Sequence, residues 1–123
     1  MNKIYIVGMG PGFESMMTKQ AIDALEASDV IVGYTVYIKL LGEKFQTKEI
    51  LTTPMRQEKE RCHLCFKKAL EGKTVSLVCS GDAGIYGLAS LMYEIGQEYD
   101  NVELSVIPGI TGQTVVQQCL EHH

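Results

Sequence analysis

Short apolar runs alternate with longer amphipathic segments along this chain, and that alternation limits the folds open to it. The apolar runs predict strands at residues 3–7, 29–33, 48–51, 74–79 and 102–107. The amphipathic segments predict helices from Ser15 to about Ala27, at 34–41, 57–70 and 85–99, and a further start at 112–119. Such alternation is typical of a parallel sheet. We therefore expect an α/β domain, a five-stranded mostly parallel sheet with helices on both faces.

Composition narrows the class of protein. The 123 residues are 46% hydrophobic and 21% charged, which suits one globular domain. A net charge of -4 argues against a nucleic-acid partner, because such a partner requires a basic face. No apolar run approaches the roughly 20 residues of a membrane helix, and the start MNKIYIVGMG lacks the features of a signal peptide. We expect a cytoplasmic protein without a membrane partner.

The four cysteines and the last residues carry little chemistry. Cys62 and Cys65 fall on the apolar side of the helix expected at 57–70, where thiols pack as small hydrophobic groups. CHLC is half of a metal motif, but no second CxxC or HxxxH completes it, so we expect no metal. LEHH at 120–123 looks like the start of a vector-encoded histidine tag and is left out of the fold argument.

Glycine-bearing segments follow four of the expected strands. They read GMGPG (8–12), GYTVY (33–37), SGDAGIYG (80–87) and PGIT (108–111). The carboxyl ends of parallel strands meet at one edge of a sheet, and ligands bind there in open α/β folds. We therefore expect these bends to share a rim that holds a ligand.

The first of these segments does not fit the common phosphate-binding loops. GMGPG has the spacing GxGxG rather than GxGxxG, and Pro11 removes a backbone N–H donor. The end of the second strand carries Gly33 and Tyr34 in place of the acidic residue that holds a ribose. No Walker loop occurs either. A dinucleotide is therefore disfavoured, and a tight turn without a ligand remains the alternative.

SGDAGIYG is the segment that most strongly suggests a ligand. Gly81 and Gly84 allow a ligand close to the backbone, and the Asp82 carboxylate accepts hydrogen bonds. The alternative is that Asp82 only caps the helix that follows, and capping is compatible with binding. A ligand without phosphates suits these loops best.

Two other pairs of side chains remain open to more than one interpretation. Tyr34 and Tyr37 share a helix face, where they either line a flat substrate or pack half-buried. Arg56 and Arg61 either meet carboxylates of a substrate or belong to a solvated charged face with the neighbouring glutamates.

Three stretches together resemble the tetrapyrrole (corrin/porphyrin) methyltransferase family. They are YIVGMGPG at the start, SGDAGIYG after the fourth strand and VIPGIT after the last, in matching order and spacing across residues 3–111. Within the family, GPGFESMMTKQA, ASDVIVGYTVYIKLL and MRQEKER look most like the branch of precorrin-3B C17-methyltransferases of cobalamin biosynthesis.

The resemblance implies S-adenosylmethionine as cofactor and a modified cyclic tetrapyrrole as substrate, methylated at C17 with ring contraction. It places the cofactor beside Pro11, Ser80, Gly81, Asp82, Ile85, Tyr86 and Thr111. It puts Tyr34 against the tetrapyrrole, and Arg56 is the basic candidate for the substrate's carboxylates. It nominates no catalytic base.

The family's proteins have two α/β domains with the cofactor between them, so the resemblance implies that residues 1–119 are the N-terminal domain. We expect such a fragment to fold but to have little or no activity alone. The resemblance also suggests a homodimer. Three alternatives remain: a precorrin-2 or precorrin-4 branch of the family, a non-catalytic domain that binds a nucleoside, and a plain α/β interaction domain.

Overall fold

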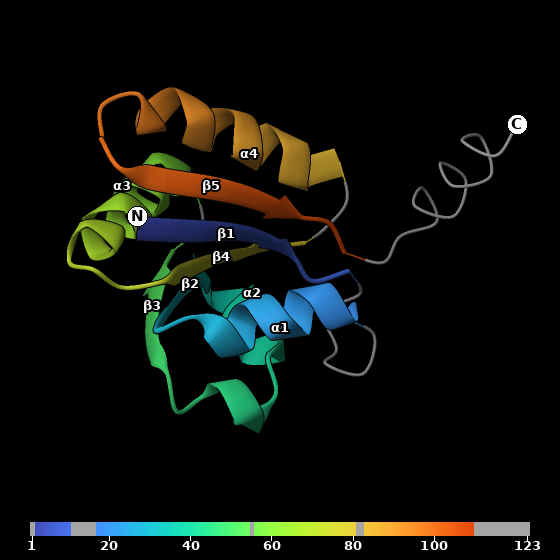
Figure 1. The fold of residues 1–123 in the computed structure, drawn as a ribbon. Coiled ribbons are helices and arrows are strands. Elements are labelled where there is room, and N and C mark those ends of the chain that lie inside the picture. The colour runs from blue at the N-terminus through green and yellow to red at the C-terminus, as the bar shows by residue number, and fades with distance from the viewer. Residues whose placement is uncertain (1, 11–16, 55, 81–82, 110–123) are drawn as a thin grey trace, which may run out of the picture.

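The computed structural model describes residues 2–10, 17–54, 56–80 and 83–109, and these form a sheet flanked by helices (Figure 1). The strands are β1 (Asn2–Gly8), β2 (Val30–Tyr34), β3 (Glu49–Thr53), β4 (Val75–Cys79) and β5 (Val102–Ile107). The helices are α1 (Lys19–Ala27), α2 (Thr35–Leu40), the 3-10 turn η2 (Glu43–Phe45), α3 (Glu58–Leu70) and α4 (Ala83–Gly96). Over these residues the sheet has five strands in the order β3-β2-β4-β1-β5, and every pairing is parallel.

Helices cover both faces of this sheet, as the sequence predicts. Figure 1 shows α3 and α4 on one side of the strands and α1 and α2 on the other. Each side has its own apolar cluster, one built around Phe66 and Met92 and the other around Leu25 and Phe45. The alternation of side chains along each strand supplies both clusters, since neighbouring residues point to opposite faces.

Strand β4 shows how the sequence supplies both layers at once. All five of its residues are buried, which explains why VSLVC reads as an unbroken apolar run. Val75 and Leu77 face the α3 and α4 layer, whereas Val78 joins the opposite cluster. Ser76 also faces that second layer, where its hydroxyl lies 2.5 Å from the Ser28 hydroxyl at the end of α1. The buried hydroxyl is thus paired, and β4 takes the central place that its composition predicts.

Two details of the helices differ from the sequence analysis. Thr18, rather than Ser15, caps α1, because the Thr18 hydroxyl accepts a hydrogen bond of 3.0 Å from the Ala21 amide. Leu70, expected on the buried side of α3, is half exposed because the helix ends there at the rim of its packing surface. Ser15, the segment 112–119 and the tail 120–123 lie outside the described residues.

Among the described residues, no helix is both long enough and apolar enough to cross a membrane. No group of three or more metal-binding side chains gathers in that same part of the chain.

Candidate functional site

The bends that follow β1, β4 and β5 meet at one edge of the sheet. The Met9 amide donates a hydrogen bond of 2.9 Å to the Cys79 carbonyl, which joins the first bend to the end of β4. Gly109, just after β5, lies so close to the first bend that a Cβ there would be 2.5 Å from the Gly10 nitrogen. Gly10 itself has a φ of 64°, which favours glycine. The expected common rim is therefore confirmed for residues 8–10, 80 and 108–109, while 11–12, 81–82 and 110–111 lie outside the described residues.

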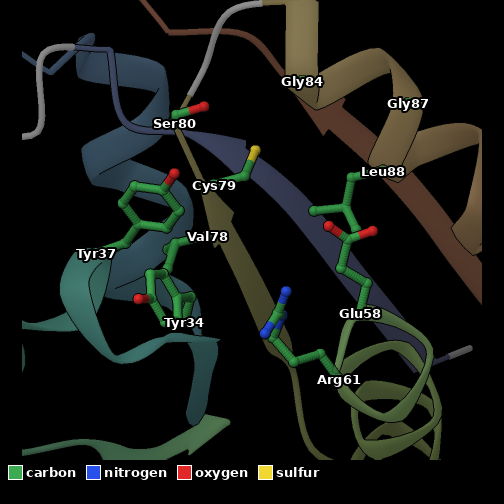
Figure 2. Close-up of a pocket in the computed structure, with 10 residues that line it drawn as sticks. All are labelled: Tyr34, Tyr37, Glu58, Arg61, Val78, Cys79, Ser80, Gly84, Gly87 and Leu88. Atoms are coloured by element: carbon green, nitrogen blue, oxygen red, sulfur yellow. The ribbon is translucent and has the colours of Figure 1, made fainter. Parts of the chain in front are cut away.

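A hollow of about 380 Å³ opens beside this rim, between the ends of β2 and β4 and the first turns of α3 and α4 (Figure 2). Of the residues that the structure describes, ten line it: Tyr34, Tyr37, Glu58, Arg61, Val78, Cys79, Ser80, Gly84, Gly87 and Leu88. The sheet supplies apolar floor, the tyrosines supply ring surface, and α3 supplies one carboxylate and one guanidinium. This combination suits a ligand with a flat apolar part and polar or charged groups at its edge.

The two tyrosines stand together on the β2 side of the hollow (Figure 2). Tyr34 is the N-cap of α2 and Tyr37 lies in its first turn. Their rings meet edge to face, with centroids 5.7 Å apart and planes at 81°. Each ring therefore packs against the other and also borders the hollow, so the two interpretations left open by the sequence are compatible.

Arg61 does not fit the solvated charged face, which is one of the two interpretations that the sequence leaves open for it. It is only 8% exposed. Its Nη1 atom donates hydrogen bonds to the Thr53 hydroxyl at 2.7 Å and to the Pro54 carbonyl at 3.1 Å. The neighbours Arg56, Glu58 and Glu60 are exposed, as the solvated interpretation expects. The sequence held one signal: Arg61 precedes the buried Cys65 by four residues and so shares its face of α3.

The residues predicted to bind cofactor and substrate fall into three groups: those that line the hollow, those that lie elsewhere, and those outside the described residues. Tyr34 and Ser80 line the hollow. Ile85 is completely buried in the core, whereas Tyr86 on α4 and Arg56 before α3 are exposed and are not among the lining residues. Four more lie outside the described residues: Pro11, Gly81, Asp82 and Thr111.

Ile85 and Tyr86 are neighbours on α4, so their side chains necessarily leave the helix in different directions. The core takes the isoleucine side chain, which leaves only its backbone for a ligand at the start of the helix. Arg56 has a φ of 71°, which turns the chain sharply between β3 and α3. The missed lining residues Glu58 and Leu88 gave no sequence signal beyond their positions in the first turns of α3 and α4.

The two thiols of α3 are buried and unreactive. Burial raises the pKa of the Cys62 thiol from 9.0 to about 11, and the same cause raises the pKa of Cys65 well above 9.0. Both thiols are therefore protonated at neutral pH, and neither serves as a nucleophile. This agrees with the packing role that the sequence predicts for them. His63, on the other side of α3, is half-buried and lies with its Nδ1 atom 2.8 Å from the Tyr99 hydroxyl, away from the hollow.

Comparison with known proteins shows the family of the chain. The family model described as Tetrapyrrole (Corrin/Porphyrin) Methylases matches residues 3–120. A relative from Salmonella typhimurium, named "Probable cobalt-factor III C(17)-methyltransferase", is 40% identical over 116 residues, which cover 94% of this chain and 48% of the relative. The chain spans about half the length, or less, of the curated relatives it matches.

Solved structures agree with the sequence match. The crystal structure of the methyltransferase CobJ has a TM-score of 0.79 with this chain at 28% identity, covering 97% of this chain and 51% of that protein. A uroporphyrin-III C-methyl transferase from Thermus thermophilus, solved in complex with S-adenyl homocysteine, has a TM-score of 0.59 at 22% identity, covering 89% of this chain and 45% of that protein. At that identity the second structure shows a shared fold.

Proposed function

Because the chain belongs to the tetrapyrrole (corrin/porphyrin) methylase family, we propose that it is part of an S-adenosylmethionine-dependent methyltransferase of cobalamin biosynthesis. The name of the Salmonella relative points to C17 of a corrin precursor as the methylated atom and to a macrocycle that already holds cobalt. Cobalt is then part of the substrate rather than a metal of the protein. Since the chain spans about half of that relative, the activity is proposed for a protein that contains this chain.

The observation that carries the proposal is the shared rim of the glycine bends. Gly8–Gly10 and Gly109 are packed backbone to backbone beside Ser80, so this part of the edge presents peptide groups rather than charged side chains. A sulfur nucleoside has an uncharged base and ribose and carries no phosphate, so peptide N–H and C=O groups fit its polar atoms. We propose that Pro11, Ser80, Gly81, Asp82 and Thr111 form its seat, and that Ile85 contributes through its backbone.

The macrocycle would lie on the other side of the hollow, against Tyr34 and Tyr37. Their rings, with Val78 and Leu88, offer apolar surface for a flat ring system. Tyr86, exposed on α4, would contact the cofactor only from outside the hollow, and it stays a prediction from the resemblance.

S-adenosylmethionine, when bound, supplies the methyl group that a ring carbon of the substrate accepts. The protein's part is to hold the two reactants in line and to exclude water, and such positioning alone lowers a barrier by several kcal/mol. No covalent nucleophile is required, which agrees with the protonated thiols of Cys62 and Cys65. The residues of the hollow thus serve binding and orientation.

We propose further that residues 1–119 form one α/β domain of a two-domain enzyme, with the cofactor between the domains. The match to about half of the CobJ structure supports this division. The chain alone would then bind ligands more weakly than the whole enzyme and transfer little methyl. Rapid methyl transfer to cobalt-factor III by the 123-residue chain would contradict the division.

Isothermal titration calorimetry tests the proposed function. We expect heat of binding with S-adenosylmethionine and with S-adenosylhomocysteine, and none with NAD, because the first bend lacks the dinucleotide pattern. Ser80→Ala, which removes one hydroxyl at the seat, should weaken both heats without changing the melting temperature appreciably. Binding of NAD alone would refute the proposal, and so would binding of none of the three by a protein with the full length of the relatives.

A further inference from the structure

A guanidinium lies almost completely buried at the edge of the hollow. Arg61 extends from the first turns of α3, and Figure 2 shows its guanidinium pointing into the space between Tyr34 and Glu58. The residue as a whole is 8% exposed, and its guanidinium carries a positive charge. Burying a charge costs free energy unless other groups compensate for it. The groups around Arg61 therefore indicate which kind of ligand group it binds.

Among the described residues, hydrogen-bond partners are found at one end of this guanidinium. Both hydrogen bonds, to the Thr53 hydroxyl and the Pro54 carbonyl, leave from Nη1. Within the described residues no buried side-chain nitrogen or oxygen lacks a hydrogen-bond partner. The Nη2 and Nε atoms of Arg61, which have no partner among these residues, therefore keep some solvent-accessible area, and Figure 2 shows the guanidinium directed toward the hollow.

The charge of Arg61 is also not neutralised by the part of the chain that the structure describes. None of the ion pairs among these residues includes Arg61. Its two partners, a hydroxyl and a carbonyl, are neutral. Glu58 lines the same hollow one turn earlier on α3, but its carboxylate is exposed and forms no ion pair with Arg61. A ligand carboxylate that accepts hydrogen bonds from Nη2 and Nε would complete the site.

We propose that Arg61 binds a carboxylate side group of the tetrapyrrole and thereby sets how the macrocycle is oriented on the tyrosine side of the hollow. This inference rests on the proposed function, since precursors of corrins carry acetate and propionate groups around the ring. It names Arg61, rather than the exposed Arg56, as the residue that selects for them.

The position of Arg61 in the sheet favours the macrocycle over the carboxylate of S-adenosylmethionine. Arg61 is tied to the end of β3, an edge strand, whereas the glycine bends follow β1, β4 and β5. One strand separates β3 from β4 and two separate it from β1, so at a spacing of about 4.8 Å the end of β3 is roughly 10 Å from the bend after β4 and roughly 14 Å from the bend after β1. A cofactor seated on the bends would thus leave the Arg61 side of the hollow to the second ligand.

The test compares two soluble porphyrins of opposite charge. Uroporphyrin III carries eight carboxylates, and a porphyrin with four N-methylpyridinium groups carries none. Fluorescence titration of the 123-residue chain should show tighter binding of uroporphyrin, and Arg61→Met should weaken it roughly 10-fold or more, as loss of a charged hydrogen-bonded pair predicts. Affinity for the cationic porphyrin should not fall.

Three further measurements separate recognition from a structural role. Arg61→Lys keeps the charge but not the fork of donors, so its affinity for uroporphyrin should lie between wild type and Arg61→Met. Should Arg61→Met fail to fold, as circular dichroism would show, Arg61→Lys decides. Thr53→Val removes the Nη1 partner but leaves the guanidinium, and it should keep uroporphyrin affinity within about 2-fold. S-adenosylhomocysteine should bind wild type and Arg61→Met equally.

Several outcomes would overturn the inference. They are equal uroporphyrin affinity in wild type and in the deciding Arg61 variant, a loss in Thr53→Val as large as in Arg61→Met, or no preference of wild type for the anionic porphyrin. Failure of a protein with the full length of the relatives to bind S-adenosylhomocysteine would instead contradict the proposed function. Titration with uroporphyrin therefore tests the inference about Arg61, and titration with S-adenosylhomocysteine tests the proposed function.

Discussion

The contact between Gly109 and the first bend supports a sharp prediction, because it involves backbone on both sides. A Cβ at residue 109 would lie 2.5 Å from the Gly10 nitrogen, 2.9 Å from the Gly8 carbonyl oxygen and 3.0 Å from the Gly10 Cα. The backbone of Gly109 is not left-handed, so alanine can adopt its conformation. The effect of Gly109→Ala is therefore steric, and the two bends must separate by about 0.9 Å to reach an ordinary contact.

Such a separation cannot be absorbed by turning a side chain. Overpacking costs about 1–3 kcal/mol, and a collision with backbone belongs near the upper end of that range. Alanine also restricts the unfolded chain, which offsets about 0.4–1 kcal/mol. We expect Gly109→Ala to lose about 2 kcal/mol of unfolding free energy, measured by urea denaturation with far-ultraviolet circular dichroism.

Gly87 provides the matched control for this substitution. It lies inside α4, and a Cβ there would meet nothing within 4 Å. Gly87→Ala should therefore raise the unfolding free energy by about 0.5–1 kcal/mol through helix propensity. If Gly109→Ala unfolds at the urea concentration of wild type or above, the bends do not pack as described, and the argument for a shared rim is refuted.

Three other predictions address capping, ionisation and the cofactor. Thr18→Ala should cost about 1 kcal/mol of stability, because it removes the acceptor for the Ala21 amide; denaturant unfolding measures this, and an unchanged midpoint would contradict the cap. Raising the pH from 9 to 11 should destabilise the fold, because unfolded thiols ionise near 9.0 while Cys62 keeps its proton to about 11. The unfolding free energy should fall by about 1.4 kcal/mol per pH unit for each thiol. This pH dependence should be lost in the Cys62→Ala/Cys65→Ala double variant. Asp82→Ala in a protein with the full length of the relatives should weaken binding of S-adenosylhomocysteine more than it lowers the melting temperature, whereas the reverse result would make Asp82 only a cap.

The fold is largely readable from the sequence because its strands are buried on both faces. A strand such as VSLVC carries no polar alternation, so its apolar run stands out between amphipathic helices, and its central position follows. The full strand order is not readable in this way. The insertion of β4 between β2 and β1 depends on how α1 and α3 pack on opposite faces, and these contacts join residues far apart in the chain.

The sequence predicts a residue of the site only where the residue's position along a strand determines its place in the fold. Tyr34 and Ser80 end or follow strands, so the geometry of a parallel sheet brings them to the hollow. Arg61 has no such position: the residues just before it, 58–60, are charged and exposed, and its one local signal is the face of α3 that it shares with Cys65. Its burial depends on the pair of acceptors at Thr53 and Pro54, which lie eight and seven residues earlier in the chain and meet it only in the folded state.

The two proposed ligand positions are related by the sheet itself. The glycine bends extend from the central strands β1 and β4 and from β5, while the Tyr34 and Arg61 side is built on β2 and β3. Strand β4 pairs with both β1 and β2, and Val78 and Cys79 at its end form the floor between the two positions. A close-packed sheet deforms less than a pair of loops. The distance between methyl donor and acceptor would thus be set by backbone pairing, which is the kind of rigid positioning that an in-line transfer requires.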